Sequence, residues 1–150
     1  MPNTPCSIGE GVISLFMTKS FDGENKDSWP RWFRSTGMVI EFDREEMIDL
    51  TTPQLGSGPA FIFELARILS NSLVEVGTRQ EVAENLVAQM IFGASKLLKE
   101  SSSSAVELRN QVTSKKGITE AALNHLKAQG LEKIFGEAIK AGHNRSKELV

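Results

Sequence analysis

The feature that most constrains the fold is the stretch from Pro59 to Val76, PAFIFELARILSNSLVEV, which carries apolar side chains on almost every side. It predicts a helix surrounded by protein, because a helix that meets water keeps one polar face. A chain that contains such a helix needs a complete apolar surround, supplied either by its own helices or by those of a partner.

The sequence after Gly56 predicts further helices joined by short connections. Thr78 lies three residues before Glu81, and Ser104 lies three residues before Glu107; each pair is the signature of a capping box at a helix start. We expect five helices, over about residues 59–76, 79–97, 105–111, 119–129 and 131–147, with Gly77 and Gly130 as stops. The four helices besides the first are few and partly short, so a homodimer is the simplest way to complete the surround.

The first third of the chain has a different pattern. Gly11 to Phe16 and Met38 to Phe42 are short apolar runs rich in β-branched residues, which predict two strands. Between them, Pro30 and Gly37 are placed to begin and end a short helix. Three aromatic residues are expected to pack this helix onto the sheet: Trp29, Trp32 and Phe33. A strand, a helix and a strand cannot close a stable sheet alone, so this part is expected to belong to a larger one.

Composition excludes several classes of function. The 17 Lys and Arg residues against 19 Asp and Glu residues give a net charge of −2, so no basic field attracts nucleic acid or anionic lipid. Cys6 is the only cysteine, which rules out an internal disulfide and is typical of a reducing compartment. Neither a signal peptide nor an apolar run of about 18 residues is recognisable, so we expect a soluble cytoplasmic protein without a membrane span.

Motifs for metal or nucleotide chemistry are lacking. His125 and His143 belong to no HExxH or CxxC pattern, so we expect surface histidines and no metal site. An acidic cluster follows the second strand: Asp43, Glu45, Glu46 and Asp49. It is expected to begin a solvated helix rather than to form an acid–base pair, since negative charge stabilises a helix N-terminus. No GxSxG, Walker or GxGxxG motif occurs, and GSGP at 56–59 is interpreted as a bend that leads into a helix.

The segment from Val112 to Thr119, VTSKKGIT, places hydroxyl residues, two lysines and a glycine directly ahead of the helix EAALNHLKAQG. The first four N–H groups of a helix have no partner within it, and the aligned peptide dipoles leave partial positive charge there, so the arrangement can hold an anion. The alternative is that Thr119 only caps its own helix. The segment by itself leaves both interpretations open.

Three stretches together resemble the pyrroline-5-carboxylate reductase family, the enzymes of the last step of proline biosynthesis. They are MPNTPCSIGEGV at the start, GSGPAF at 56–61, and ELRNQVTSKKGITEAALNHL at 107–126. The third follows the family signature of a valine, two small or hydroxyl residues, a glycine and a threonine ahead of a helix. With RSKEL at 145–149, the likeness covers practically the whole chain.

The resemblance implies a helical dimerisation domain over residues 53–150. Over residues 1–52 it implies the end of a dinucleotide-binding Rossmann domain, so the fold class is α+β by composition and mainly α. The phosphate-binding glycines of a Rossmann domain do not occur in this sequence. We therefore expect a truncated chain, inactive unless an N-terminal Rossmann part acts with it, either as a separate N-terminal Rossmann polypeptide or as an unrecorded N-terminal part.

The resemblance also implies roles in the reduction of a small cyclic imino acid, 1-pyrroline-5-carboxylate, to L-proline by NADPH or NADH. The substrate carboxylate would be held by Ser114, Gly117, Ile118 and Thr119. The Thr119 hydroxyl is the implied catalytic group and would face the ring nitrogen. The NADP or NAD cofactor would lie beside residues from both parts of the chain: Pro2, Asn3, Thr4, Gln111 and Val112.

The loop departs from the family pattern, which usually has two glycines, often after a proline. Here Lys115 and Lys116 precede the single Gly117. If position 116 needs a positive φ, a side chain there costs roughly 1–2 kcal/mol. Both ammonium groups are expected to point to solvent. The departure leaves two alternatives to a reductase portion: a noncatalytic helical dimerisation module, and a gene remnant without activity.

Overall fold

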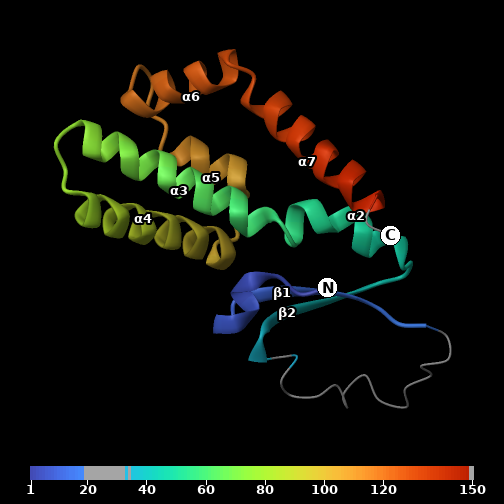
Figure 1. Ribbon diagram of the computed structural model, residues 1–150. Coiled ribbons are helices and arrows are strands. Elements are labelled where there is room, and N and C mark those ends of the chain that lie inside the picture. Colours follow the sequence, from blue (N-terminus) through green and yellow to red (C-terminus); the bar gives the residue numbers. More distant parts are fainter. Residues whose placement is uncertain (19–32, 34, 149–150) are drawn as a thin grey trace. The chain divides into compact units, whose positions relative to one another are not determined.

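The computed structural model describes residues 1–18, 33 and 35–148. Its elements are, in chain order, the 3-10 helix η1 (Thr4–Ile8), the strands β1 (Gly11–Phe16) and β2 (Gly37–Phe42), and the helices α2 (Glu46–Leu55), α3 (Gly58–Glu75), α4 (Gln80–Glu100), α5 (Ala105–Gln111), α6 (Ile118–Ala128) and α7 (Leu131–Lys147) (Figure 1). Contacts divide the chain into two compact units, residues 1–62 with 136–150 and residues 63–135.

The two predicted strands and five predicted helices are present, and the chain is α+β and mainly α as expected. β1 and β2 pair in parallel, from Gly11 opposite Gly37 to Phe16 opposite Phe42. The acidic cluster does begin a helix, α2. Most of the helix predicted between the strands, with Trp29, Pro30 and Trp32, lies outside the described residues, whereas Phe33 and Ser35 near its predicted end are helical.

Asn3 joins the N-terminal segment to two other elements of the first unit. Pro2 forms an antiparallel bridge with Ile13, so the segment lies along β1. The Asn3 Oδ1 accepts a hydrogen bond from the Val12 N–H at 2.8 Å, and the Asn3 Nδ2 donates one to the Leu55 carbonyl at 3.0 Å. Both ends of the Asn3 amide are therefore used to tie β1 to the end of α2.

The start of β1 lies so close to its neighbours that only glycine fits. A Cβ on Gly11 would lie 2.2 Å from the Cys6 Sγ, and a Cβ on Gly37 would lie 2.1 Å from the Gly11 carbonyl oxygen. Neither approach leaves room for a side chain. The two glycines thus allow η1, β1 and β2 to pack together, with Ile13 and Ser14 buried in β1.

The C-terminal part of α7 approaches α2 within the first unit. Pro53 is buried in α2, and a Cβ on Gly142 would lie 3.3 Å from the Pro53 Cβ, so a small residue is present where the helices meet. His143 follows this contact and is half-buried, with no hydrogen-bond partner for its Nδ1 among the described residues. The expectation of a surface histidine is therefore wrong for His143, whereas His125 is exposed.

Helix α3 ends in a Schellman motif. The Gly77 N–H donates to the Val74 carbonyl at 2.9 Å, the Thr78 N–H donates to the Leu73 carbonyl at 3.0 Å, and Gly77 has a φ of 98°. Thr78 is held at the end of α3, and Arg79 becomes the N-cap of α4 without a side-chain cap. The capping box predicted at Thr78 is therefore wrong.

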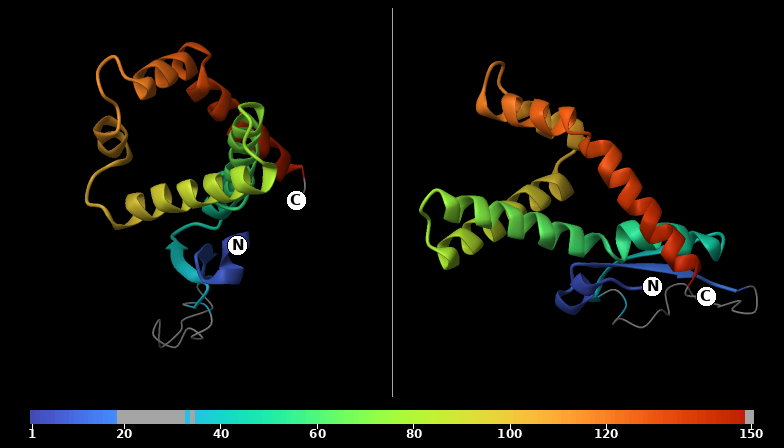
Figure 2. Two further views of the ribbon diagram at one scale, coloured as in Figure 1. Left: turned by 90° about the vertical axis from the view of Figure 1, so that its left-hand side faces the viewer. Right: turned by 45° about the horizontal axis from the view of Figure 1, so that its top comes forward.

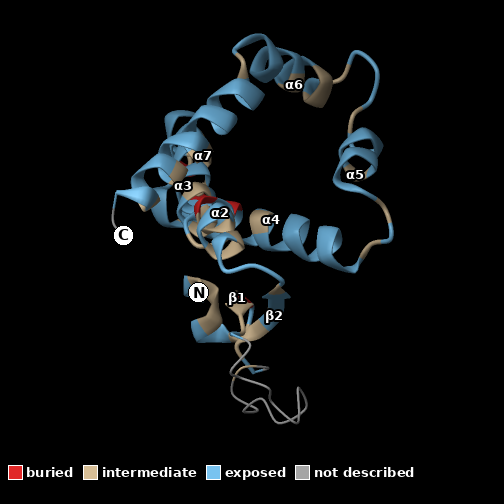
Figure 3. Ribbon diagram, turned by 90° about the vertical axis from the view of Figure 1, so that its right-hand side faces the viewer, coloured by how far each residue is buried: buried red, intermediate tan, exposed pale blue. Residues whose placement is uncertain are grey.

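Few helical residues of the second unit are buried (Figure 3). The two views in Figure 2 show α4, α5 and α6 running in different directions rather than side by side. Only Ser70 of α3 is buried, so the described residues of one chain do not by themselves supply the protein surround expected for this helix. Large apolar side chains of α3 and α4 are exposed: Ile62, Phe63, Leu65, Ile68, Leu86, Met90, Phe92, Leu97 and Leu98.

Candidate functional site

The segment VTSKKGIT forms a turn between α5 and α6, within the second unit. The Gly117 N–H donates to the Ser114 carbonyl at 3.0 Å, which closes a four-residue turn. Lys116 has a φ of 60°, and no other non-glycine residue among those described has a positive φ, so Lys115 keeps a negative one. These signs of φ are typical of a type II turn, which favours proline at its second residue and glycine at its third.

The two lysines therefore occupy the positions where the family pattern usually has proline and glycine. Lys116 does adopt the left-handed conformation, with its cost of roughly 1–2 kcal/mol for a residue with a side chain. Lys115 and Lys116 are both exposed, as expected.

Helix α6 begins without a side-chain cap. Its N-cap is Gly117, and Thr119 is the second residue of the helix, so the alternative in which Thr119 caps α6 is wrong. Gly117 has no side chain and offers no acceptor to the first N–H groups of the helix. These N–H groups lie at the positive end of the helix dipole and can therefore donate hydrogen bonds to an acceptor outside the helix.

Ser114 lies against the start of α6. A Cβ on Gly117 would come within 2.2 Å of the Ser114 Oγ and 2.9 Å of the Ser114 carbonyl oxygen, so only glycine allows the hydroxyl this position. Ile118 and Thr119 follow directly in the first turn of the helix. The Ile118 side chain is 91% exposed, whereas Thr119 is half-buried.

Glu120 also belongs to this turn, although it was not among the predicted site residues. Its Oε2 accepts a hydrogen bond from the Lys116 N–H at 2.7 Å, and the residue is half-buried. In a capping box the acidic residue at the third helical position accepts from the N-cap N–H. Here that N–H already donates to Ser114, so the carboxylate accepts from the preceding residue instead. The sequence feature that could have identified Glu120 is an acidic residue three positions after Gly117.

Side-chain hydrogen bonds satisfy backbone groups at both ends of helix α5, which leads into the turn. The capping box predicted at its start is confirmed: the Ser104 Oγ accepts from the Glu107 N–H at 3.3 Å, and the Ser104 N–H donates to the Glu107 Oε2 at 2.7 Å. Hydrogen bonds from the Ser104 backbone and hydroxyl hold the pKa of the Glu107 carboxyl below its usual value. At the other end, the Thr113 Oγ1 donates to the Arg109 carbonyl at 2.6 Å.

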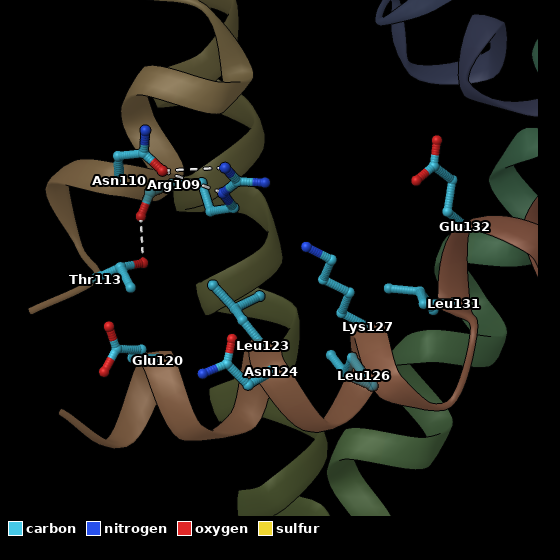
Figure 4. A pocket seen from close by; sticks show the side chains of 10 residues that line it. All are labelled: Arg109, Asn110, Thr113, Glu120, Leu123, Asn124, Leu126, Lys127, Leu131 and Glu132. Carbon is cyan, nitrogen blue, oxygen red and sulfur yellow. Dashed lines mark hydrogen bonds between the residues drawn. The ribbon is translucent and has the colours of Figure 1, made fainter. Parts of the chain in front are cut away.

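A hollow of about 540 Å³ lies beside α6 in the second unit (Figure 4). Its wall comes from α5, the segment between α5 and α6, α6 itself and the start of α7, and consists of Arg109, Asn110, Thr113, Glu120, Leu123, Asn124, Leu126, Lys127, Leu131 and Glu132. Arg109 and Lys127 are matched in number by Glu120 and Glu132, so no sign of charge dominates. None of the predicted site residues is in the wall, whereas Glu120 belongs both to the wall and to the turn.

The residues predicted to lie near a nicotinamide belong to different units. Pro2, Asn3 and Thr4 are in the first, and Gln111 and Val112, at the end of α5, are in the second. All except Asn3 are exposed. Because the amide of Asn3 is used inside the first unit, Pro2 and Thr4 are the residues of that segment that are open to a ligand.

Two further features are absent from residues 1–18, 33 and 35–148. No group of three or more His, Cys, Asp or Glu side chains there is placed to hold a metal ion. No helix in these ranges has the length and apolar character that crossing a membrane requires.

Comparison with known proteins identifies the family. Residues 45–149 match the family described as pyrroline-5-carboxylate reductase dimerisation. The pyrroline-5-carboxylate reductases of Pseudomonas aeruginosa and Staphylococcus aureus are 32% and 33% identical to this chain over 149 residues. Each match covers 99% of this chain and 55% of the relative. The chain thus spans about half the length of the curated relatives it matches.

Solved structures share the fold. The pyrroline-5-carboxylate reductase of Coxiella burnetii superimposes with a TM-score of 0.92 at 37% identity, over 99% of this chain and 55% of that one. The pyrroline carboxylate reductase of Plasmodium falciparum, solved with NADP bound, has a TM-score of 0.88 at 30% identity, over 99% of this chain and 60% of that one. With its helical part matched by the family and nearly all of it matched by these relatives, the chain belongs to the pyrroline-5-carboxylate reductase family.

Proposed function

We propose that this chain is the C-terminal portion of a pyrroline-5-carboxylate reductase, which reduces 1-pyrroline-5-carboxylate to L-proline with NADPH or NADH. One observation supports the proposal above all: α6 begins at Gly117 without a side-chain cap, and the Ser114 hydroxyl lies against its start. Uncapped N–H groups and a hydroxyl are suitable donors for a small carboxylate. Because the relatives are about twice as long, the activity is proposed for an assembly that includes a nucleotide-binding part.

In this proposal the substrate carboxylate accepts hydrogen bonds from the Ser114 Oγ and from N–H groups in the first turn of α6. Ile118 contributes through its backbone, since its side chain is exposed. Hydrogen bonds to an ionised acceptor are roughly twice as strong as neutral ones, and the helix dipole adds partial positive charge. The carboxylate thereby fixes the position of the ring to which it is attached.

The Thr119 hydroxyl is proposed to face the ring nitrogen once the carboxylate is bound. Reduction of the C=N bond adds a hydride to carbon and a proton to nitrogen, so a hydroxyl beside the nitrogen can donate a hydrogen bond there. The nicotinamide supplies the hydride when it is bound. Correct orientation of the reactants can lower the barrier by about 7–11 kcal/mol, so the site does not need a strong acid or base.

The cofactor contacts implied by the family resemblance are kept as a proposal. The exposed Pro2, Thr4, Gln111 and Val112 would lie against the nicotinamide, while Asn3 orients the N-terminal segment through its bonds to β1 and α2. Residues 1–52 are proposed to form the end of a Rossmann domain, with the helical domain over 53–150. A nucleotide-binding part outside residues 1–150 would then hold the cofactor phosphates.

A homodimer is proposed through the helical domain. Phe63, Met90 and Phe92 are 65%, 50% and 60% exposed, on helices that leave most of their apolar side chains uncovered. Apolar surface of this kind marks protein interfaces, and symmetric dimers are the commonest soluble oligomers. A second copy would supply the surround that α3 lacks within one chain.

Titration of the chain with L-proline, followed by calorimetry, tests the carboxylate site. Ser114→Ala should weaken binding about tenfold, the equivalent of one hydrogen bond to a charged group. Lys115→Ala, an exposed neighbour outside the proposed donor set, should stay within about twofold of the parent. An affinity that does not depend on Ser114 would contradict the assignment.

Turnover is tested by adding the separately produced nucleotide-binding part of a relative, about 120 residues for a domain of usual size. The imine and NADPH are then supplied, and loss of NADPH absorbance is followed. We expect turnover that Ser114→Ala reduces. A folded mixture with no turnover would refute the reductase proposal.

Analytical ultracentrifugation tests the homodimer. Phe92→Glu should shift the chain toward monomer, because it places a charge on the exposed apolar surface, whereas Gln89→Glu on the same helix should not. A monomeric parent would contradict the proposed dimer. A stable dimer without affinity for L-proline would instead favour the noncatalytic helical module.

A further inference from the structure

We propose that Glu120 is a positioning residue: its hydrogen bond to the Lys116 N–H stabilises the positive φ that a glycine at position 116 would adopt readily. The inference rests on the proposed carboxylate site and concerns the turn that presents it. A type II turn needs a positive φ at its third residue, and Lys116 supplies it with a φ of 60°. For a residue with a side chain this conformation is disfavoured by about 5- to 30-fold. A contact from elsewhere is therefore needed to hold Lys116 in place.

The Glu120 carboxylate makes that contact. Its Oε2 accepts the Lys116 N–H at 2.7 Å, from a half-buried residue in the first turn of α6. Because Glu120 is part of a regular helix, the bond fixes the Lys116 peptide relative to α6. The Gly117 N–H, bonded to the Ser114 carbonyl at 3.0 Å, fixes the other side of the turn. The two hydrogen bonds together hold the turn in one arrangement.

The arrangement of the turn determines where the Ser114 hydroxyl lies. That hydroxyl is packed on Gly117, where a Cβ would be only 2.2 Å away. If Lys116 left the left-handed conformation, the peptide group between Lys115 and Lys116 would reorient, and Ser114 would no longer be held in the same place against Gly117. Glu120 therefore acts on substrate affinity through Lys116. A glycine at position 116 adopts a positive φ readily and would not depend on this bond.

A double-mutant cycle in the full chain tests the proposal. The dissociation constant for L-proline is measured by calorimetry in the parent, Glu120→Ala, Lys116→Gly and the double variant. We expect Glu120→Ala to weaken binding about fivefold when residue 116 is lysine, and less than about twofold when it is glycine. Glu120→Gln, which keeps an acceptor oxygen, should remain within about twofold of the parent. Equal losses in the two backgrounds, or no loss in either, would overturn the proposal.

Hydrogen exchange of the Lys116 amide gives a readout that does not require proline binding. Glu120→Ala should raise its exchange rate about tenfold, the parent and Glu120→Gln should stay protected, and the far-UV circular dichroism should be the same for all three. An unprotected Lys116 amide in the parent would refute the role of Glu120. If no version binds L-proline, the proposed function fails, and the exchange rates still decide whether Glu120 holds the turn.

Discussion

Lys116→Gly should stabilise the protein, and Lys115→Gly should destabilise it. The two lysines are adjacent, exposed, and central to one turn, but only Lys116 has a positive φ, of 60°. The left-handed conformation costs a non-glycine residue roughly 1–2 kcal/mol, and the greater chain entropy of glycine in the unfolded state offsets roughly 0.5–1 kcal/mol of any gain. Lys116→Gly should therefore raise the free energy of unfolding by about 0.5–1 kcal/mol, and Lys115→Gly should lower it by a similar amount.

Urea unfolding, followed by circular dichroism at one protein concentration, measures both variants against the parent. The midpoints should move in opposite directions at an unchanged m value. In a chain of 150 residues, 1 kcal/mol corresponds to about 2–4 °C in Tm, which thermal unfolding resolves. If Lys116→Gly destabilises the chain as much as Lys115→Gly does, position 116 gains nothing from glycine, and the assignment of a strained type II turn is refuted.

Three further substitutions test other contacts. Gly117→Ala should lower the free energy of unfolding by about 1–3 kcal/mol, because its Cβ would lie 2.9 Å from the Ser114 carbonyl oxygen, a backbone atom, and would also displace the Ser114 hydroxyl; an unchanged urea midpoint would contradict the packing. Ser104→Ala should cost about 0.5–2 kcal/mol through loss of the cap. The pKa of the Glu107 carboxyl is lowered in the folded chain, so the stabilisation that this carboxylate provides is present above the usual carboxyl pKa and is lost as pH falls through the folded pKa. The difference in unfolding free energy between the parent and Ser104→Ala should therefore shrink in acid. A difference independent of pH would argue that the Glu107 carboxylate does not stabilise the cap. Asn3→Ala should cost about 1–3 kcal/mol, since its two hydrogen bonds tie separate elements, and hydrogen exchange of the β1 amides should rise; unchanged protection would refute the role of Asn3.

Local patterns predicted most of the helices. The apolar run from Pro59, the stop at Gly77 and the capping box at Ser104 each depend on residues within about one helical turn, and the structure contains all three. The prediction of a capping box at Thr78 was wrong because the Thr78 N–H donates to the preceding helix, and α4 therefore begins later, with Arg79 as its N-cap. Where the end of one helix and the start of the next can each use the same residue, a sequence pattern for one helix does not predict its boundary reliably.

The resemblance indicated which segment to consider as a candidate site, whereas the local geometry of that segment came only from the structure. The resemblance pointed to Ser114 and Gly117, and the structure places the Ser114 hydroxyl directly on Gly117. It did not point to Glu120, because the contact of that carboxylate depends on the direction in which the turn leaves α5. Thr119 proved to be a residue within the helix rather than its cap, since Gly117 already occupies the N-cap position.

The sequence by itself determined the elements of this protein: a strand pair, a run of helices and their main stops, because helix and strand preferences arise from interactions among near neighbours. Only the tertiary structure decided that Asn3 bonds to Leu55, 52 residues away, and that the apolar faces of α3 and α4 stay uncovered in one chain. Such features depend on which distant surfaces meet when the chain folds, and on whether it has enough apolar partners to cover them.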